Sequence, residues 1–131
     1  MYRDFLWKTM TETATGSNKL KGLLPSNTVV GHKTGSSDRN LKGVKMADND
    51  AGVVITPGGK KYYIAVFVTD SSETDEENAA IIAHISRMVY DGKLEVGKES
   101  GEVHPFLLSC LHGAVLFNPL RKGVLKGDVM S

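Results

Sequence analysis

The chain has 131 residues, which is enough for one small domain with a core of its own. Its formal net charge is +1 and 24% of its residues are charged, so binding to nucleic acid or to an anionic membrane by charge alone is excluded. Cys110 is the single cysteine, which excludes an intrachain disulfide.

The first residues predict a helix with one apolar stripe. The spacing of the apolar side chains is helical, and glycine is the residue type that usually follows a helix end, so we expect the helix to end near Thr15 and Gly16. No capping residue precedes the pattern, which favours a truncated parent sequence. The residues expected to be buried along the stripe are Tyr2, Phe5, Leu6, Thr9 and Met10.

Three strands are predicted next, over residues 28–36, 44–55 and 61–69. The turn Pro57-Gly58-Gly59 between the last two favours a tight antiparallel hairpin. The third strand is apolar on both faces, because Ile64, Val66 and Val68 alternate with Ala65 and Phe67. A strand of this kind is expected to have helices on both sides.

A final helix is predicted to cover one face of that sheet. It starts near Thr74, which forms a capping box with Glu77, and it stops at Gly92. The fold class is therefore α/β (α+β), with an antiparallel sheet flanked by helices. The apolar side chains that share one face of this helix are Ile81, Ile82, Ile85, Met88 and Val89.

The tripeptide Lys33-Thr34-Gly35, followed by Ser36, combines residue types that suit anion binding. In a strand, Lys33 and Gly35 share one face, and Thr34 and Ser36 share the other. Gly35 lets a flat ligand lie against the backbone. A lysine cation, two hydroxyls and a backbone N–H can then hold a carboxylate and a developing oxyanion.

The stretch from Thr11 to Tyr90 resembles the carboxyl-terminal part of class A serine β-lactamases. The matching segments, in order, are TETATGSNKLKGLLPSNTVVGHKTGSSD, ADNDAGVVITPGGKKYYIAVFVTDS and NAAIIAHISRMVY. The HKTGS context, with extra residues before Asp48-Asn49-Asp50, is most similar to the extended-spectrum subgroup. The resemblance implies that residues 1–92 are the carboxyl-terminal part of a β-lactamase/transpeptidase-like fold, which needs about twice this length.

The resemblance also implies roles for particular residues. Lys33 supports the electrostatics around the substrate carboxylate and the serine proton relay, and Thr34 and Ser36 bind that carboxylate. The Ser36 N–H supplies half of the oxyanion hole. Ser37 shapes the pocket for the antibiotic side chain, and Lys19 is a further candidate for holding the carboxylate. The implied reaction is hydrolysis of a β-lactam through an acyl-serine, without metal or organic cofactor.

The catalytic motifs of that family are absent from this sequence. The family uses an S-x-x-K pair, an S-D-N loop and a Glu that positions the deacylating water. No serine here has a lysine three residues later: Ser17 is followed at that distance by Leu20, and Ser36 by Arg39. We therefore expect the chain alone to be inactive, carrying the substrate-holding wall without the nucleophile.

Residues 93–131 have no counterpart in the resembled family. We expect this tail to be disordered or loosely packed. Its apolar run over residues 106–117 is too short for a helix that spans a bilayer. The spacing of His104, Cys110 and His112 fits no common zinc site, so no metal is expected.

Two alternatives stay open. The first is a fragment of a penicillin-binding transpeptidase or carboxypeptidase, which shares the KTG strand. The second is a non-catalytic chain that acts only with a complementing amino-terminal fragment. The expected partners are thus a β-lactam antibiotic and such a fragment. Localisation is left open, because the resembled enzymes are periplasmic but MYRDFLWKTM lacks the features of a secretory signal.

Overall fold

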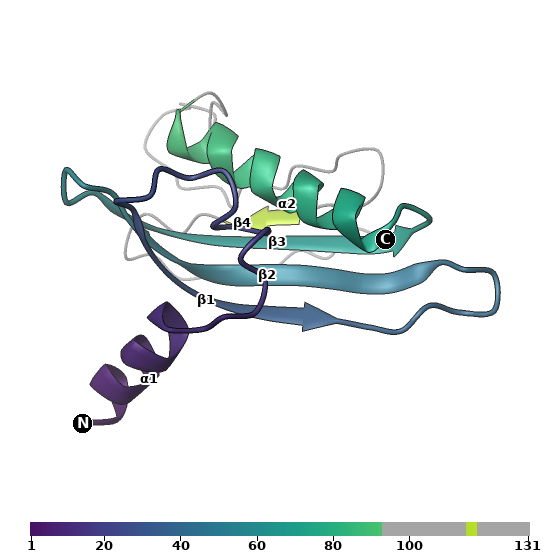
Figure 1. Cartoon of the computed structure of the whole chain (residues 1–131), viewed down its shortest axis with the longest axis horizontal. Coiled ribbons are helices and arrows are strands. Elements are labelled where there is room, and N and C mark those ends of the chain that lie inside the picture. Colours follow the sequence, from purple (N-terminus) through teal and green to yellow (C-terminus); the bar gives the residue numbers. More distant parts are fainter. Residues whose placement is uncertain (93–114, 118–131) are drawn as a thin grey trace, which may run out of the picture.

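The computed structural model describes residues 1–92 and a short strand at 115–117, and it has the predicted mixed architecture (Figure 1). The strands form an antiparallel sheet in the order β1-β2-β3-β4. The elements in chain order are α1 (Tyr2–Thr11), β1 (Val29–Ser36), β2 (Lys45–Ile55), β3 (Lys61–Ser71), α2 (Asp75–Tyr90) and β4 (Val115–Phe117).

The register of β1, β2 and β3 sorts their side chains onto two faces. Val30 lies opposite Val54, and Tyr62 lies opposite Val54 on the other side, so these three side chains share one face. The β2–β3 turn is tight: Gly59 has φ +83° and donates its N–H to the Thr56 carbonyl at 2.9 Å. The three predicted strands are confirmed, with ends that differ from the prediction by one or two residues.

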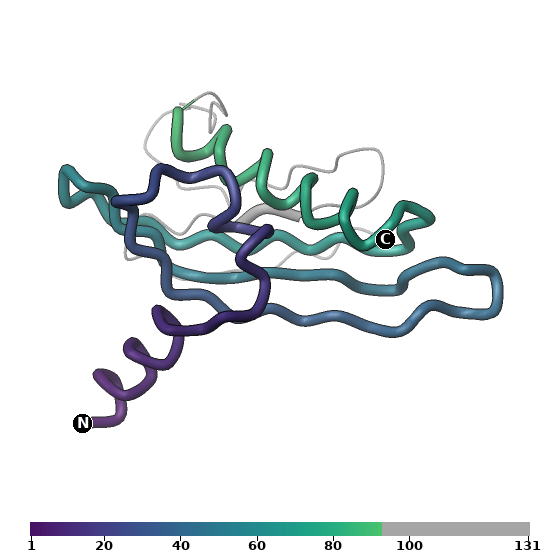
Figure 2. The backbone as a smooth tube through the Cα atoms, in the orientation of Figure 1, coloured from purple at the N-terminus to yellow at the C-terminus, as the bar shows by residue number. Residues whose placement is uncertain are grey.

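The core lies between this face of the sheet and α2, which runs roughly along the strands in Figures 1 and 2. The loop over residues 12–28 crosses the same face and adds the fully buried Leu20. Burial of these aliphatic side chains supplies the main driving force for folding. The buried core residues are Leu20, Val30, Val54, Tyr62, Ile64, Val66, Val68, Ile82 and Ile85.

Helix α2 begins and ends as the sequence predicts. The Thr74 hydroxyl accepts the Glu77 N–H, and the Glu77 carboxylate accepts the Thr74 N–H at 2.8 Å, which completes the capping box. Gly92 follows the helix with φ +67°. The prediction for Met88 is wrong, since it is 41% exposed. The buried stripe is rotated toward Asn78 and Ser86, whose side chains find hydrogen-bond partners in the core.

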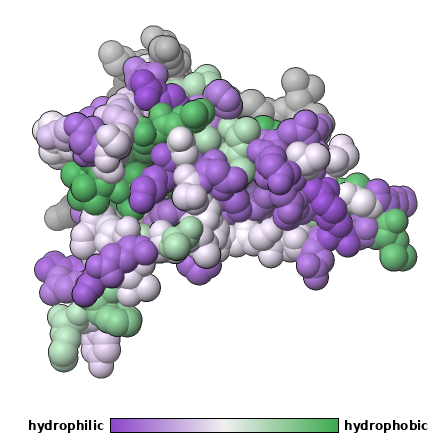
Figure 3. All heavy atoms as spheres, viewed as in Figure 1, coloured by the Kyte–Doolittle hydropathy of each residue, from purple (hydrophilic) through white to green (hydrophobic). Residues whose placement is uncertain are grey.

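Helix α1 corrects two expectations. It ends at Thr11, before the predicted Thr15-Gly16, and it has no buried residue. Tyr2, Phe5 and Leu6 are 85%, 72% and 58% exposed, and Figure 3 shows apolar side chains on its surface. An apolar stripe is buried only when another surface covers it, and no part of residues 12–92 covers this one.

The other side of α1 contacts the sheet. A methyl group built on Gly31 would lie 2.8 Å from the Trp7 ring and 3.3 Å from Thr11, so α1 packs directly on the backbone of β1. This contact is on the face of the sheet opposite to α2. Among the described residues, α2 covers one face of β3, and α1 packs on β1 at the other face. The expectation of a second helical cover over β3 itself, which relied on a missing part of the parent as well as on α1, stays a prediction.

The tail contributes one described element. The backbone of β4 pairs with β3, with Val66 opposite Leu116. The other predictions for residues 93–131, including those for His104, Cys110 and His112, lie outside the described residues. Within residues 1–92 and 115–117, no helix has the length and apolar character needed to cross a bilayer.

The loop over residues 12–28 is fixed to the sheet and to α2. The Leu20 N–H donates to the Asp50 carboxylate at 3.1 Å, and the Ser86 hydroxyl donates to the Leu20 carbonyl at 2.7 Å. Gly16 has φ +68°, and a methyl group there would lie 2.3 Å from Thr34 Cγ2. Only glycine therefore fits this turn without moving Thr34.

We expect Gly16→Ala to destabilise the chain more than Gly59→Ala. Both glycines have positive φ, so alanine is strained by about 1–2 kcal/mol at either position. Nothing lies within 4 Å of a methyl group at Gly59, whereas the clash at Gly16 should add about 1–3 kcal/mol. Urea denaturation measures both losses. Equal losses would contradict the close contact of Gly16 with Thr34.

The carboxylates at the start of α2 should make the free energy of unfolding depend on pH. Hydrogen bonds from Lys45, and then from Arg39, lower the pKa of Asp75, and the Thr74 backbone lowers the pKa of Glu77. A carboxyl group of this kind contributes stability that is present above its unfolded pKa and is lost as pH falls through its folded pKa.

The free energy of unfolding should therefore fall as pH drops below about 4. Asp75→Asn should flatten this dependence, whereas Glu12→Gln, outside the helix, should leave it unchanged. Urea unfolding between neutral and acid pH measures the slopes, and equal slopes for all three proteins would rule out the link.

Candidate functional site

The KTG segment lies on β1, which is an edge strand among the described residues because its one strand partner is β2. Val30 and His32 point into the core, so Thr34 and Ser36 continue along that face toward the strand end. Lys33 and Gly35 point to the opposite face, and both are exposed. The edge thus offers a cation on one face and hydroxyls on the other.

Lys33 is available for a ligand. Its side chain is exposed, and its ammonium group donates to the carbonyl of Thr34 next to it. Gly35 has no heavy atom within 4 Å of the position that a methyl group would take, so the strand can be approached closely at this point. This is the arrangement that a flat anionic ligand needs beside a strand.

The turn at Gly16 brings Lys19 to the hydroxyl face. A methyl group on Gly16 would lie 2.3 Å from Thr34 Cγ2 and 3.6 Å from Lys19 Cδ, so the two side chains are neighbours. The Lys19 ammonium forms a hydrogen-bonded ion pair with Asp48, which lies directly opposite Ser36 in the register of β1 and β2. Lys19 is therefore placed beside both Thr34 and Ser36.

Ser37 is tied to the backbone of β2. Its N–H donates to the Ala47 carbonyl at 2.9 Å, and its hydroxyl accepts the Ala47 N–H at 2.9 Å. These bonds extend the pairing of β1 and β2 by one residue. The structure thus separates Ser37 from the exposed group formed by Lys33, Gly35 and Ser36 and gives it a part in holding the end of the strand.

A buried pair beneath the edge strand was not predicted from the sequence. His32, next to Lys33, is 1% exposed, and its Nδ1 lies 2.8 Å from Oδ2 of the fully buried Asp50. The same carboxylate oxygen accepts the Leu20 N–H. Opposite His32, Gly52 leaves no room for a side chain, since a methyl group would lie 2.4 Å from the Gly31 carbonyl oxygen. Asp50 therefore joins β1, β2 and the loop.

A signal for this pair is present in the alternation of the strands. His32 falls two residues after the apolar Val30, and Asp50 falls four residues before the apolar Val54, so each polar side chain continues a buried row. A histidine and a carboxylate on buried rows of neighbouring strands are expected to pair, because an unpaired buried charge is costly.

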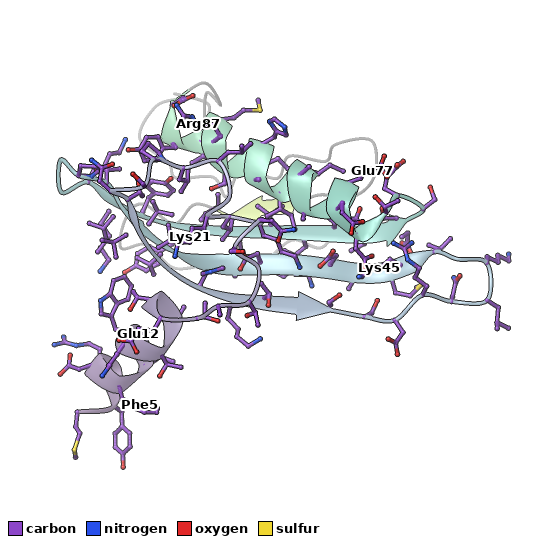
Figure 4. All side chains as sticks on the ribbon, in the orientation of Figure 1. Phe5, Glu12, Lys21, Lys45, Glu77 and Arg87 are labelled. Atoms are coloured by element: carbon purple, nitrogen blue, oxygen red, sulfur yellow. The ribbon has the colours of Figure 1, made fainter. Side chains whose placement is uncertain are left out.

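A second charged cluster holds the far end of the hairpin. Lys45, which is labelled in Figure 4, is buried, and its Nζ lies 2.9 Å from Oδ1 of Asp75 at the start of α2. Arg39 Nη2 lies 2.7 Å from the same oxygen, and Arg39 Nη1 donates to the Gly43 carbonyl at 2.8 Å. These contacts tie the connection between β1 and β2 to α2, and so they help to set the register at Ser36.

The burial of Tyr62 has an electrostatic consequence inside the same fold. Desolvation, with a smaller effect from Tyr90, raises the pKa of Tyr62 to about 12. The Tyr62 hydroxyl is therefore protonated at neutral pH, and its side chain is part of the hydrophobic core. Among the described residues, no group of three or more His, Cys, Asp or Glu side chains is placed to hold a metal ion. The group suited to ligand binding is the edge of β1.

Comparisons with known proteins identify the family. The model of the beta-lactamase enzyme family matches residues 2–92. A β-lactamase of Bacteroides uniformis is 74% identical over 89 residues, which cover 68% of this chain and 30% of the relative. Beta-lactamase VEB-1 of Pseudomonas aeruginosa is 51% identical over 88 residues, which cover 67% of this chain and 29% of the relative.

Solved structures agree with the sequence relatives. A class A β-lactamase of Bacteroides cellulosilyticus matches with a TM-score of 0.66 and 67% identity, over 69% of this chain and 32% of that one. The TLA-1 extended-spectrum β-lactamase matches with a TM-score of 0.67 and 53% identity, over 70% of this chain and 33% of that one. This chain spans about 30% of the length of the curated relatives that it matches.

The region matched by the family model contains α1, α2 and the three strands that build the KTG edge, and it ends two residues after α2. The resemblance noted in the sequence is thereby confirmed. The chain belongs to the beta-lactamase enzyme family, and its residues 2–92 correspond to part of a class A β-lactamase.

Proposed function

We propose that residues 1–92 form the substrate-binding edge of a class A β-lactam hydrolase. The observation that carries this proposal is the arrangement of β1, where Lys33 and Gly35 lie exposed on one face and Thr34 and Ser36 lie beside Lys19 on the other. A β-lactam has a carboxylate next to a carbonyl that becomes an oxyanion during attack. Cations, hydroxyls and a backbone N–H are the groups that stabilise these charges.

Each residue then has a task in an acyl-serine mechanism. A serine oxygen attacks the β-lactam carbonyl, the ring C–N bond breaks, and water later hydrolyses the acyl ester. Lys33 supplies positive charge for the carboxylate and for the serine proton relay. Thr34 and Ser36 hold the carboxylate with their hydroxyls, and the Ser36 N–H donates to the oxyanion.

The nucleophile of this mechanism lies outside residues 1–131. The sequence contains no S-x-x-K pair and no S-D-N loop, and the chain spans about 30% of the length of its curated relatives. The exposed apolar stripe of α1 supports this view, because an uncovered group of Tyr2, Phe5 and Leu6 is typical of a surface that packs against more protein. The complementing segment is therefore the amino-terminal part of a class A β-lactamase.

The names of the matched proteins favour a hydrolase over a transpeptidase. The curated relatives and the solved structures described above are named β-lactamases. The fold and the KTG segment alone do not separate the two classes, since a fold hosts more than one chemistry. The transpeptidase alternative therefore ranks second.

The purified chain alone is expected to hydrolyse no β-lactam above the buffer rate. Loss of the nucleophile and of its proton acceptor costs on the order of a millionfold in turnover in serine hydrolases. Nitrocefin absorbance and intact-mass measurement of the protein check this expectation. Rapid turnover, or an acyl adduct on a serine of this chain, would refute the proposed division of labour.

Hydrolysis should return when the chain is co-expressed with the amino-terminal part of the Bacteroides uniformis relative that precedes the matched region. Lys33→Ala should then lower kcat/KM by the equivalent of about 2–4 kcal/mol, because a cation acting on the transition state is lost. Thr34→Ala and Ser36→Ala should cost less, since water can replace one hydroxyl contact.

Lys60→Ala is the matched control, because Lys60 is exposed at the β2–β3 turn, away from the KTG segment. Its kcat/KM should equal that of the unmodified complex. The proposed function fails if the two segments assemble without hydrolysing nitrocefin, or if Lys33→Ala has no larger effect than Lys60→Ala.

A further inference from the structure

The two lysines at the KTG edge differ in their charge environment. Lys33 is exposed, and the contact that its ammonium makes is with a neutral carbonyl. Lys19 has a side chain that is 12% exposed, and its ammonium is paired with the Asp48 carboxylate, whose side chain is 3% exposed. An ion pair this well shielded from water neutralises both partners.

Lys19 is the cation closest to the Asp48 carboxylate. The other nearby cation, Lys45, lies 3.9 Å from Asp48 but 2.9 Å from Asp75. Lys45 therefore has a better partner of its own, which Arg39 also contacts at 2.7 Å. Asp48 thus forms its close ion pair with Lys19 and a longer one, at 3.9 Å, with Lys45.

The Lys19–Asp48 pair lies where a ligand carboxylate would bind. Asp48 is directly opposite Ser36, and directly opposed side chains in antiparallel strands have Cβ atoms about 4.5–5.5 Å apart. The Lys19 stem passes the Gly16 turn beside Thr34. The Asp48 carboxylate is thus paired with the Lys19 ammonium, which lies near the Thr34 and Ser36 hydroxyls.

We propose that Asp48 is a specificity-determining residue that acts through Lys19. It is an internal carboxylate that neutralises Lys19, so that the charge of a substrate carboxylate is recognised mainly by Lys33. This inference rests on the proposed function. Without Asp48, both lysines would favour substrates with a free carboxylate over neutral substrates. With Asp48 present, this preference is weaker.

Asp48→Asn tests this role in the complex reconstituted with the amino-terminal segment. The variant keeps the size of the side chain but removes its charge. The Lys19 ammonium then has no internal counter-ion and can pair with the substrate carboxylate. The KM for nitrocefin should fall about tenfold, because a charge-assisted hydrogen bond is gained. The KM for the methyl ester of nitrocefin and both kcat values should stay unchanged, because this binding is equal in the ground and transition states.

Asp70→Asn is the matched control for net charge. Asp70 is exposed at the end of β3 and has φ +51°, a conformation that asparagine tolerates well. It changes the net charge by the same amount as Asp48→Asn. Its KM values should equal those of the unmodified complex, which separates local pairing from a general change in charge.

The double variant Lys19→Ala/Asp48→Asn gives a second test with no change in net charge. If Asp48 neutralises Lys19, the double variant should lose the tenfold fall in KM for nitrocefin that Asp48→Asn produces, because that fall requires the charge of Lys19. If Lys19 binds the substrate carboxylate directly, the double variant should instead raise KM for nitrocefin and leave KM for its ester unchanged. That result would overturn the inference even if the single variant failed to fold.

The outcomes separate the two proposals. An active complex that loses hydrolysis with Lys33→Ala, but whose KM for nitrocefin is not lowered by Asp48→Asn, would overturn the role of Asp48 and leave the proposed function intact. A complex that assembles but never hydrolyses nitrocefin would overturn the proposed function, and the role of Asp48 with it. A tenfold lower KM that disappears in the double variant supports both.

Discussion

The buried carboxylate of Asp50 is the contact on which the geometry of the edge strand depends. It accepts the backbone N–H of Leu20 at 3.1 Å and lies 2.8 Å from Nδ1 of His32, so one side chain on β2 holds both β1 and the loop. Breaking a buried, hydrogen-bonded ionisable pair by removal of one partner costs about 3–5 kcal/mol. The His32 end of this pair directly precedes Lys33 in β1.

Two further constraints set the positions of the cations. Gly16 packs against Thr34 in a turn that only glycine fits, and this brings Lys19 to the hydroxyl face. Strand alternation sends Lys33 to the other face. The loop and β1 therefore present one neutralised cation, Lys19, and one exposed cation, Lys33, on opposite faces of the edge strand.

The sequence predicted the strands and α2 well, since both depend on local signals. The alternation from Ile64 to Val68 defines β3, and Thr74 with Glu77 defines the start of α2. The prediction for α1 was less accurate. Its spacing indicated a buried stripe, but burial depends on a covering surface that residues 12–92 do not provide.

The candidate site was only partly predictable for the same reason. The KTG residues adjoin one another in the sequence, so their chemistry was visible there. The pairs Lys19 with Asp48 and His32 with Asp50 join residues that are 29 and 18 positions apart. They depend on the register of β1 and β2 and on the path of the loop, and neither is specified by spacing alone.

The most direct measurement is an NMR titration of the reconstituted complex with benzylpenicillin, using an amino-terminal segment whose nucleophilic serine is replaced by alanine. The account predicts that amide shifts centre on Thr34 and Ser36, and that the Lys33 ammonium signal moves while that of Lys19 does not. Shifts centred on α2, with Thr34 and Ser36 unmoved, would contradict the claim that β1 is the substrate-binding edge.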